Sequence, residues 1–352
     1  MLIDVLILLA SLVVILFGAE LFTNGIEWLG RKLGLGEGAV GSVLAAVGTA
    51  LPETLIPIIA IVFTTAEGSH EVGVGAILGA PFMLSTLAMF VTGLGVLAYR
   101  NRRSTGTSLA VDTVVLAHDL RWFFVAYGLA IGAAFLPPDL SAARWAIAAI
   151  LVGLYAWYVR GHLQGEVGEH TEDLAPLRMR RLDRSAHERD PEEPRMRVIA
   201  LQVLASLGLI IVGAVFFIDG VNSVAHQLGV SEVLLALVIA PIATELPEKF
   251  NSIIWVRQNK DTLALGNITG AMVFQSAIPT VVGLVLAADT WVVAEGSYTA
   301  FASAAIALIA TAVIFVPGWR RGRLEAKHLL VGGLFYLGYV AFVIALVTGA
   351  IR

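Results

Sequence analysis

The chain has 352 residues, of which 58% are hydrophobic and only 14% are charged, and its mean hydropathy is +0.84. A soluble domain needs more charge to cover its surface, so this composition indicates a protein embedded in a membrane. The net charge of −4 gives no electrostatic sign of a nucleic-acid partner, and the absence of cysteine excludes disulfides and thiolate metal sites.

A transmembrane helix needs about 20 mainly apolar residues, and ten segments of the chain qualify. In chain order they are residues 2–22, 38–63, 72–98, 120–136, 142–159, 198–218, 232–256, 262–287, 297–316 and 329–349. The first segment lacks a basic leader and a small-residue cleavage pattern, so we interpret it as a retained span and not as a signal peptide. The sequence therefore predicts an all-α membrane protein with ten transmembrane helices.

Basic residues decide the predicted orientation, because they gather in the loops that follow the odd-numbered spans. They include Arg31, Lys32, Arg100, Arg102, Arg103, Arg178, Arg180, Arg181, Arg257, Lys260, Arg320, Arg321, Arg323 and Lys327. The loops after the even-numbered spans instead hold the acidic residues Glu67, Glu71, Asp139, Asp289 and Glu295. The positive-inside rule therefore places the odd loops in the cytoplasm and both termini outside, in what we expect to be a prokaryotic plasma membrane.

The one long polar segment is residues 160–197, between the fifth and sixth spans. It mixes charges of both signs with several prolines, which is typical of a mobile loop and not of a domain. Its histidines, His162, His170 and His187, lack metal-ligand spacing, so we expect them to be solvated.

The two halves of the chain are related in sequence, because a shift of 195 residues aligns them. The strongest match places GTALPE, residues 48–53, on ATELPE, residues 243–248. When four residues are dropped from the following loop, Gly75, Gly79, Ala80 and Ser85 fall on Gly266, Gly270, Ala271 and Ser276.

Equivalent positions are separated by five spans, so the two halves must cross the membrane in opposite directions. We therefore divide the chain into a first five-helix repeat, residues 1–160, a charged cytoplasmic loop, residues 161–197, and a second repeat, residues 198–352. Inverted repeats of this kind place a substrate site at their interface near the membrane midplane, on discontinuous helices.

The shared LPE motif has the chemistry of a cation site. Glu53 and Glu248 lie near the middle of their spans, where an ionised side chain costs at least about 2.5–3.5 kcal/mol and needs a partner or a cavity. The proline before each glutamate interrupts the helix and frees backbone carbonyls. Carboxylates, freed carbonyls and the hydroxyls of Thr49 and Thr244 are oxygen ligands, which hard cations such as Ca2+ prefer.

These motifs resemble the α-repeats of the calcium/cation antiporter superfamily, which includes the sodium/calcium exchangers. The resemblance covers roughly residues 20–90 and 215–285, and its ten-span topology agrees with the prediction above. It implies that Glu53 and Glu248 bind Ca2+, and that Thr49 and Thr244 help to bind Ca2+ or Na+.

The chain also departs from the family pattern. The serine expected before LPE is Ala50 in the first repeat and Glu245 in the second, and the Asn or Asp expected on the following helices is Pro81 and Met272. Oxygen ligands for Na+ are therefore depleted, whereas Glu245 adds a third carboxylate near Glu248.

Several other polar residues lie at membrane depth. Lys249 either extends to the cytoplasmic surface, pairs with Glu245, or acts as a tethered cation that substitutes for a co-transported ion. The remaining residues complete the site or make hydrogen bonds between helices: Ser85, Asn251, Ser252, Asn267, Thr269, Gln275 and Ser276. Of these, we treat Lys249, Asn251, Gln275, Ser85 and Ser276 as accessory candidates.

The sequence therefore predicts a secondary antiporter that exchanges Ca2+, or another divalent cation, for H+ or Na+ by alternating access around a midplane carboxylate site. A cation channel, or an ion-sensing member of the fold that no longer transports, are the alternatives. The expected partners are inorganic cations and the lipid bilayer. No metalloprotease motif, cysteine nucleophile or phosphate-binding loop is present, so we expect neither an enzyme nor a cofactor.

Overall fold

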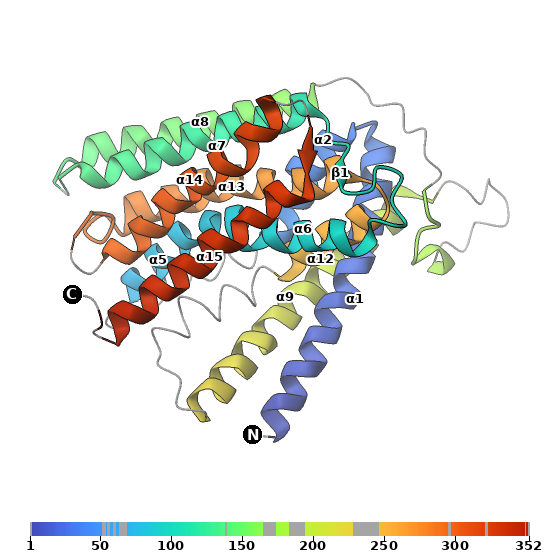
Figure 1. Cartoon of the computed structure of the whole chain (residues 1–352), viewed down its shortest axis with the longest axis horizontal. Coiled ribbons are helices and arrows are strands. Elements are labelled where there is room, and N and C mark those ends of the chain that lie inside the picture. The colour runs from blue at the N-terminus through green and yellow to red at the C-terminus, as the bar shows by residue number, and fades with distance from the viewer. Residues whose placement is uncertain are drawn as a thin grey trace.

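The computed structural model describes most of the chain. The described residues are 2–50, 54, 57–58, 61–62, 69–137, 139–164, 174–182, 194–227, 246–294, 297–320, 323–348 and 350. Nearly all of them are helical (Figure 1). Over these residues, β1 (Ser108–Leu109) and β2 (Leu324–Glu325) pair antiparallel, with Leu109 opposite Leu324.

The first half of the chain contains, in order, α1 (Leu2–Leu33), α2 (Glu37–Ala39), the π-helical η1 (Val40–Ala45), α3 (Ala46–Thr49), α5 (Ser69–Met83), the π-helical η2 (Leu84–Ala88), α6 (Met89–Tyr99), α7 (Thr113–Gly132), the 3-10 turn η3 (Ala133–Phe135) and α8 (Ser141–Leu163). The second half contains the 3-10 turn η4 (Arg180–Leu182), α9 (Met196–Gln227), α12 (Leu246–Arg257), α13 (Asp261–Leu286), α14 (Tyr298–Arg320) and α15 (Ala326–Val347). The all-α membrane fold predicted from the sequence is confirmed.

Eight helices of the described chain are long and apolar enough to cross a membrane. The other two predicted spans, residues 38–63 and 232–256, extend into residues outside the description. Their described parts include the helical stretch Glu37–Thr49 and α12. Several predicted boundaries were wrong by a few residues. The fourth span begins at Thr113 and not at residue 120, and the fifth continues to Leu163.

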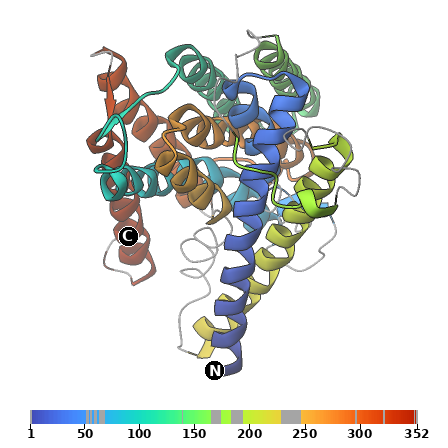
Figure 2. The same ribbon diagram turned by 90° about the vertical axis from the view of Figure 1, so that its right-hand side faces the viewer.

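The first helices of the two halves show the inversion directly. α1 and α9 have 32 residues each and lie side by side (Figures 1 and 2). Near the start of α1, Leu8 contacts Gly220 towards the end of α9, whereas Gly25 further along α1 contacts Val203 near the start of α9. The equivalent helices therefore run in opposite directions.

A helix is interrupted at the motif of the first repeat. α3 ends at Thr49, and Ala50 leaves the α-helical range with φ −81° and ψ 4°. In the second repeat the described residues resume at Leu246, the first residue of the LPE motif, and α12 runs from there to Arg257. A helix end thus coincides with the motif of the first repeat, as its proline predicts, and the break predicted before the second motif lies outside the described residues.

Helix α13 lies at the centre of the protein, and nearly all of its residues are buried. It packs against α5, α7, α8, α12 and η1. Glycine permits the closest of these approaches, because a methyl group at Gly270 would overlap the backbone carbonyl of Ser42 in η1. The glycines of the second repeat therefore bring its central helix against the π-helical segment of the first.

Residues 174–182 of the polar segment between the repeats are packed, whereas a mobile loop was predicted there. In its described part, Leu177 is buried with Trp28 of α1 and Val198 of α9. The side chains of Asn24 and Trp28 donate hydrogen bonds to the carbonyl of Ala175 at 3.1 and 2.9 Å. Residues 174–182 therefore pack against the α1–α9 pair, an arrangement that a charged, proline-containing sequence does not reveal.

A buried ion pair fixes the junction between α12 and α13. The guanidinium of Arg103 binds both carboxylate oxygens of Asp261, at 2.8 and 2.7 Å, and both side chains are almost fully buried. Arg103 also donates to the carbonyls of Gly106, Ser108 and Val256. Arg103 lies in the basic loop that predicts the orientation of the chain, and it also stabilises the interior of the protein.

Candidate cation-binding site

The two repeats meet where the motif-bearing segment of the first repeat ends. Thr49, the last residue of α3, is fully buried. Its hydroxyl donates to the carbonyl of Ala45 at 3.1 Å and lies 3.3 Å from Oδ1 of Asn267 in α13. A motif threonine of the first repeat therefore contacts an amide oxygen of the second repeat inside the protein.

Glu248, the motif glutamate of the second repeat, lies in the first turn of α12 and is fully buried. α12 packs against both α13 and α3, the two segments that carry Asn267 and Thr49. The hydroxyl of Ser252, one turn after Glu248, donates to the carbonyl of Ala264 in α13 at 3.0 Å. The turn of α12 that carries the carboxylate is thus held against the central helix.

The next residue, Lys249, is only 4% exposed. This burial disfavours the interpretation of a lysine that extends to the membrane surface. Its predicted partner, Glu245, lies outside the described residues, as do Glu53 and Thr244. The roles predicted for Glu53, Thr244 and Glu245 therefore remain predictions.

Two buried amides belong to the same region. Asn251 shares a helix face with Glu248 because it follows by three residues, and Gln275 lies on α13. Neither amide nitrogen nor amide oxygen of these side chains has a hydrogen-bond partner among the described residues, and the same holds for Nδ2 of Asn267. A buried polar atom without a partner costs about 1–3 kcal/mol, so these side chains are suited to receive polar ligands.

The serines at equivalent positions of the two repeats both bond within their own helices. Ser85 in η2 donates to the carbonyl of Phe82 at 3.1 Å, and Ser276 in α13 donates to that of Met272 at 2.6 Å. Each hydroxyl oxygen keeps its lone pairs for another donor or a cation.

Prolines change the backbone beside these serines. Pro81 lies inside α5, where it offers no amide to the carbonyl of Ile77, and the π-helical η2 begins three residues later. In α13, Pro279 leaves the carbonyl of Gln275 without its usual amide donor, and the Thr280 hydroxyl donates to it at 3.3 Å. π-Helical segments occur frequently at functional sites.

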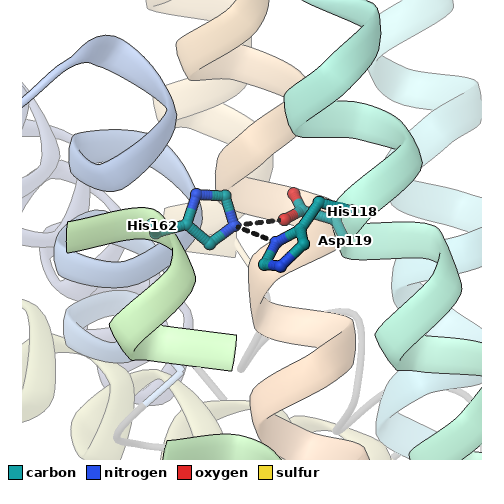
Figure 3. A group of neighbouring side chains, drawn as sticks. All are labelled: His118, Asp119 and His162. Carbon is teal, nitrogen blue, oxygen red and sulfur yellow. Dashed lines mark hydrogen bonds and ion pairs between the residues drawn. The ribbon is translucent and has the colours of Figure 1, made fainter. Parts of the chain in front are cut away.

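A second polar cluster was missed from the sequence. His162 does not lie in a solvated loop, as predicted, but in the last turn of α8, where its side chain is 5% exposed. Its Nε2 lies 2.8 Å from Oδ1 of Asp119 and 3.1 Å from Nδ1 of His118, both on α7 (Figure 3). The adjacent residues His118 and Asp119 are the available signal, but they lie just before the predicted fourth span, which begins at residue 120.

The comparisons with known proteins agree with this architecture. The model of the family described as sodium/calcium exchanger protein matches residues 3–162 and 198–347. CaxA of Alkalimonas amylolytica is 24% identical over 97% of this chain and 98% of its own length. The sodium/calcium exchanger MaX1 of Methanosarcina acetivorans is 24% identical over 98% of each chain.

The fold is similar to that of a solved transporter. A structure of the sodium-calcium exchanger NCX_Mj soaked with Na+ and Sr2+ superimposes with a TM-score of 0.71, over 97% of this chain and 98% of that one. The sequence identity is 19%, so this likeness concerns the fold.

Proposed function

Because the chain belongs to the sodium/calcium exchanger protein family, whose model matches both of its repeats, and is therefore a membrane cation antiporter and not an enzyme, we propose that it exchanges Ca2+ for H+ or Na+. The transported cation binds between the repeats near the membrane midplane. Alternating access moves the surrounding helices around this site. The central loop faces the cytoplasm, and both termini lie outside.

The contact between Thr49 and Asn267 carries this proposal. It joins the motif of one repeat to the central helix of the other. α12, which carries the buried Glu248, packs against both α3 and α13. A divalent cation bound there gains a carboxylate, a hydroxyl and an amide oxygen, which are the ligands that Ca2+ takes in proteins.

The proposed ligand set combines described residues with motif residues beyond them. Glu53 and Glu248 provide the principal carboxylates, Thr49 and Thr244 provide hydroxyl or carbonyl oxygens, and Glu245 adds a further carboxylate. Lys249, Asn251, Gln275, Ser85 and Ser276 are the accessory residues. The unpartnered amides of Asn251 and Gln275 support this assignment, because a polar ligand would offset the free-energy cost of their burial.

The counter-ion follows from the ligands that are missing. Ala50, Pro81 and Met272 remove three side-chain oxygens that the family pattern supplies for Na+. A proton needs only a carboxylate that is protonated in one step of the cycle, and Glu53, Glu245 and Glu248 can provide one. We therefore favour H+ over Na+ as the coupling ion.

The test is uptake of 45Ca2+ into proteoliposomes under separately imposed H+ and Na+ gradients. Saturable uptake driven by an outward H+ gradient is the expected result. The matched control is Glu20→Gln, because Glu20 forms an exposed ion pair with Arg178 away from the site and its variant should transport normally. Uptake that does not saturate and persists without any counter-gradient would favour a channel, and no uptake would favour an ion-sensing protein.

A further inference from the structure

We propose that His118, Asp119 and His162 form a binding site for a transition-metal ion of the Zn2+ class, separate from the site of the transported cation. The three side chains come from two neighbouring helices, α7 and α8, and point toward one another (Figure 3). His162 lies in the last turn of α8, beside the start of the central loop. The cluster is thus placed where an ion can enter from the side of that loop.

The geometry fits a small cation. One ligand atom from each side chain lies within 4.8 Å of the others, and the two measured separations at His162 Nε2 are 2.8 and 3.1 Å. Ligand atoms around a tetrahedral Zn2+ ion with bonds of about 2.0 Å lie about 3.3 Å apart. A slight outward movement of the two imidazole rings therefore admits the ion without a change in the helices.

Protons alone do not satisfy these contacts. Trp122 Nε1 donates to Nε2 of His118 at 2.9 Å, so the proton of a neutral His118 ring is on Nδ1 and points at Nε2 of His162. If His162 Nε2 accepts that proton, its lone pair is occupied and it has nothing to donate to the Asp119 carboxylate. If His162 Nε2 carries a proton for Asp119, two N–H groups face each other.

A metal ion resolves this conflict, because it accepts a lone pair from each of the three atoms. The proton of His118 then moves to Nε2, and Trp122 gives up its hydrogen bond to that atom. Metal binding should therefore change the environment of the Trp122 indole, which gives the proposal a spectroscopic signature.

The surroundings hold the carboxylate of Asp119 in place. Asp119 is fully buried. Its Oδ2 accepts from the hydroxyls of Ser42 and Thr269 at 2.7 and 2.5 Å, and its Oδ1 accepts from Tyr158 at 2.9 Å. Such outer contacts orient the ligands of a metal site.

The ligand chemistry selects the class of ion. Imidazole nitrogens suit Zn2+, Co2+ and Ni2+, whereas Ca2+ takes six to eight oxygen ligands. Two histidines and one carboxylate therefore favour a transition metal over the cation proposed for transport. The site is expected to retain its ion in excess Ca2+.

The position of the cluster suggests what the ion would do, and this step rests on the proposed function. Ser42 belongs to η1, which leads through α3 to Thr49, and Thr269 follows Asn267 by two residues on α13. Asp119 therefore connects the α7–α8 pair to both segments that meet at Thr49 and Asn267. A bound ion would hold these segments together and slow the movement that exchange requires.

The primary test measures Zn2+ binding by calorimetry with the purified full-length protein in detergent after removal of any affinity tag. We expect one Zn2+ per chain that excess Ca2+ does not displace, together with a change in tryptophan emission. His118→Gln and His162→Gln should each weaken binding at least tenfold. His170→Gln and His187→Gln are matched controls in the central loop and should bind normally.

Two further variants test whether the metal site is separate from the site of the transported cation and whether the Trp122 hydrogen bond competes with the metal ion. Glu248→Gln should bind Zn2+ normally, and Trp122→Phe should bind it at least as tightly as the native chain, because a competing hydrogen bond has been removed. Absence of stoichiometric binding by monodisperse native protein would overturn the proposal, as would binding that survives in His118→Gln and His162→Gln or that is lost in Glu248→Gln.

Inhibition is measured separately, as Zn2+ suppression of Ca2+ flux that His162→Gln relieves. If the native protein carries no flux, the proposed function fails while the binding result still decides the metal site. If flux is present and Zn2+ binds without slowing it, the site stands but its regulatory role is refuted.

Discussion

Thr49 and Asn267 are 218 positions apart in the sequence, yet their side-chain oxygens lie 3.3 Å apart in the interior. One ends a helix of the first repeat, and the other lies in the buried central helix α13 of the second. Their contact places polar atoms of both repeats at one point inside the protein, and it gives the first prediction.

Thr49→Val and Asn267→Ala should each weaken the apparent affinity for Ca2+ in proteoliposome uptake. Because the two residues are in contact, the double variant should lose less than the sum of the single losses, with a coupling of about 0.5–3 kcal/mol. Thr92→Val is the matched control, since the Thr92 hydroxyl is also buried and, among the described residues, bonds only the carbonyl of Ala88 four positions earlier. Strictly additive losses would mean that the pair does not act as one part of the site.

The second prediction concerns the two motif carboxylates. Glu53→Gln and Glu248→Gln keep the size of the side chain but remove its charge, so each should abolish divalent transport while the protein remains inserted and monodisperse. Uptake is measured as before, and size-exclusion chromatography in detergent checks the fold. Near-normal flux in either variant would place the site elsewhere.

The third prediction concerns stability at the junction of α12 and α13. Arg103→Met leaves the buried carboxylate of Asp261 without its cation, and breaking a buried pair in this way costs about 3–5 kcal/mol of unfolding free energy. Thermal unfolding of the purified protein should therefore shift to clearly lower temperature.

Lys327→Met provides the control for this measurement, because it removes an ion pair with Glu325 in which Lys327 is 63% exposed. Such a pair contributes about 0–1 kcal/mol. Equal shifts for the two variants would show that the Arg103–Asp261 pair has no special weight.

Much of the fold could be predicted because it depends on local patterns. Hydropathy located the spans, and the repeated LPE motif implied the inversion that the antiparallel α1 and α9 display. The helix interruption after Thr49 followed from the proline of the first motif.

The unpredicted parts depend on tertiary contacts. The cluster of His118, Asp119 and His162 forms because α7 and α8 pack together, and no spacing in the sequence relates residue 162 to residues 118 and 119. The docking of Leu177 against Trp28 likewise depends on one apolar residue within a charged segment. The choice of Asn267 as the partner of Thr49 depends on how closely η1 approaches α13 at Gly270.

The fourth prediction concerns topology, which rests on the distribution of basic residues. The chain has no cysteine, so a single introduced cysteine reports its own side of the membrane. Ser185→Cys in the central loop should react with a membrane-impermeant maleimide only after the cells are opened, whereas Asp139→Cys should react in intact cells. A tag after Arg352 should also be accessible from outside, and the opposite pattern would refute the orientation.

The last prediction concerns the coupling ion, where this chain departs from its family pattern. If protons and the divalent cation compete for the same carboxylates, uptake should fall as the external pH is lowered, since protonated carboxyl groups no longer bind Ca2+. Glu245→Gln removes one carboxylate of this group and should flatten the pH profile while leaving some uptake. External Na+ should have little effect, because Ala50, Pro81 and Met272 lack the oxygens that would coordinate it. The measurement is the initial rate of 45Ca2+ uptake against pH and against Na+, in the native chain and in Glu245→Gln. A steep dependence on Na+ with a flat pH profile that Glu245→Gln leaves unchanged would instead establish sodium as the counter-ion.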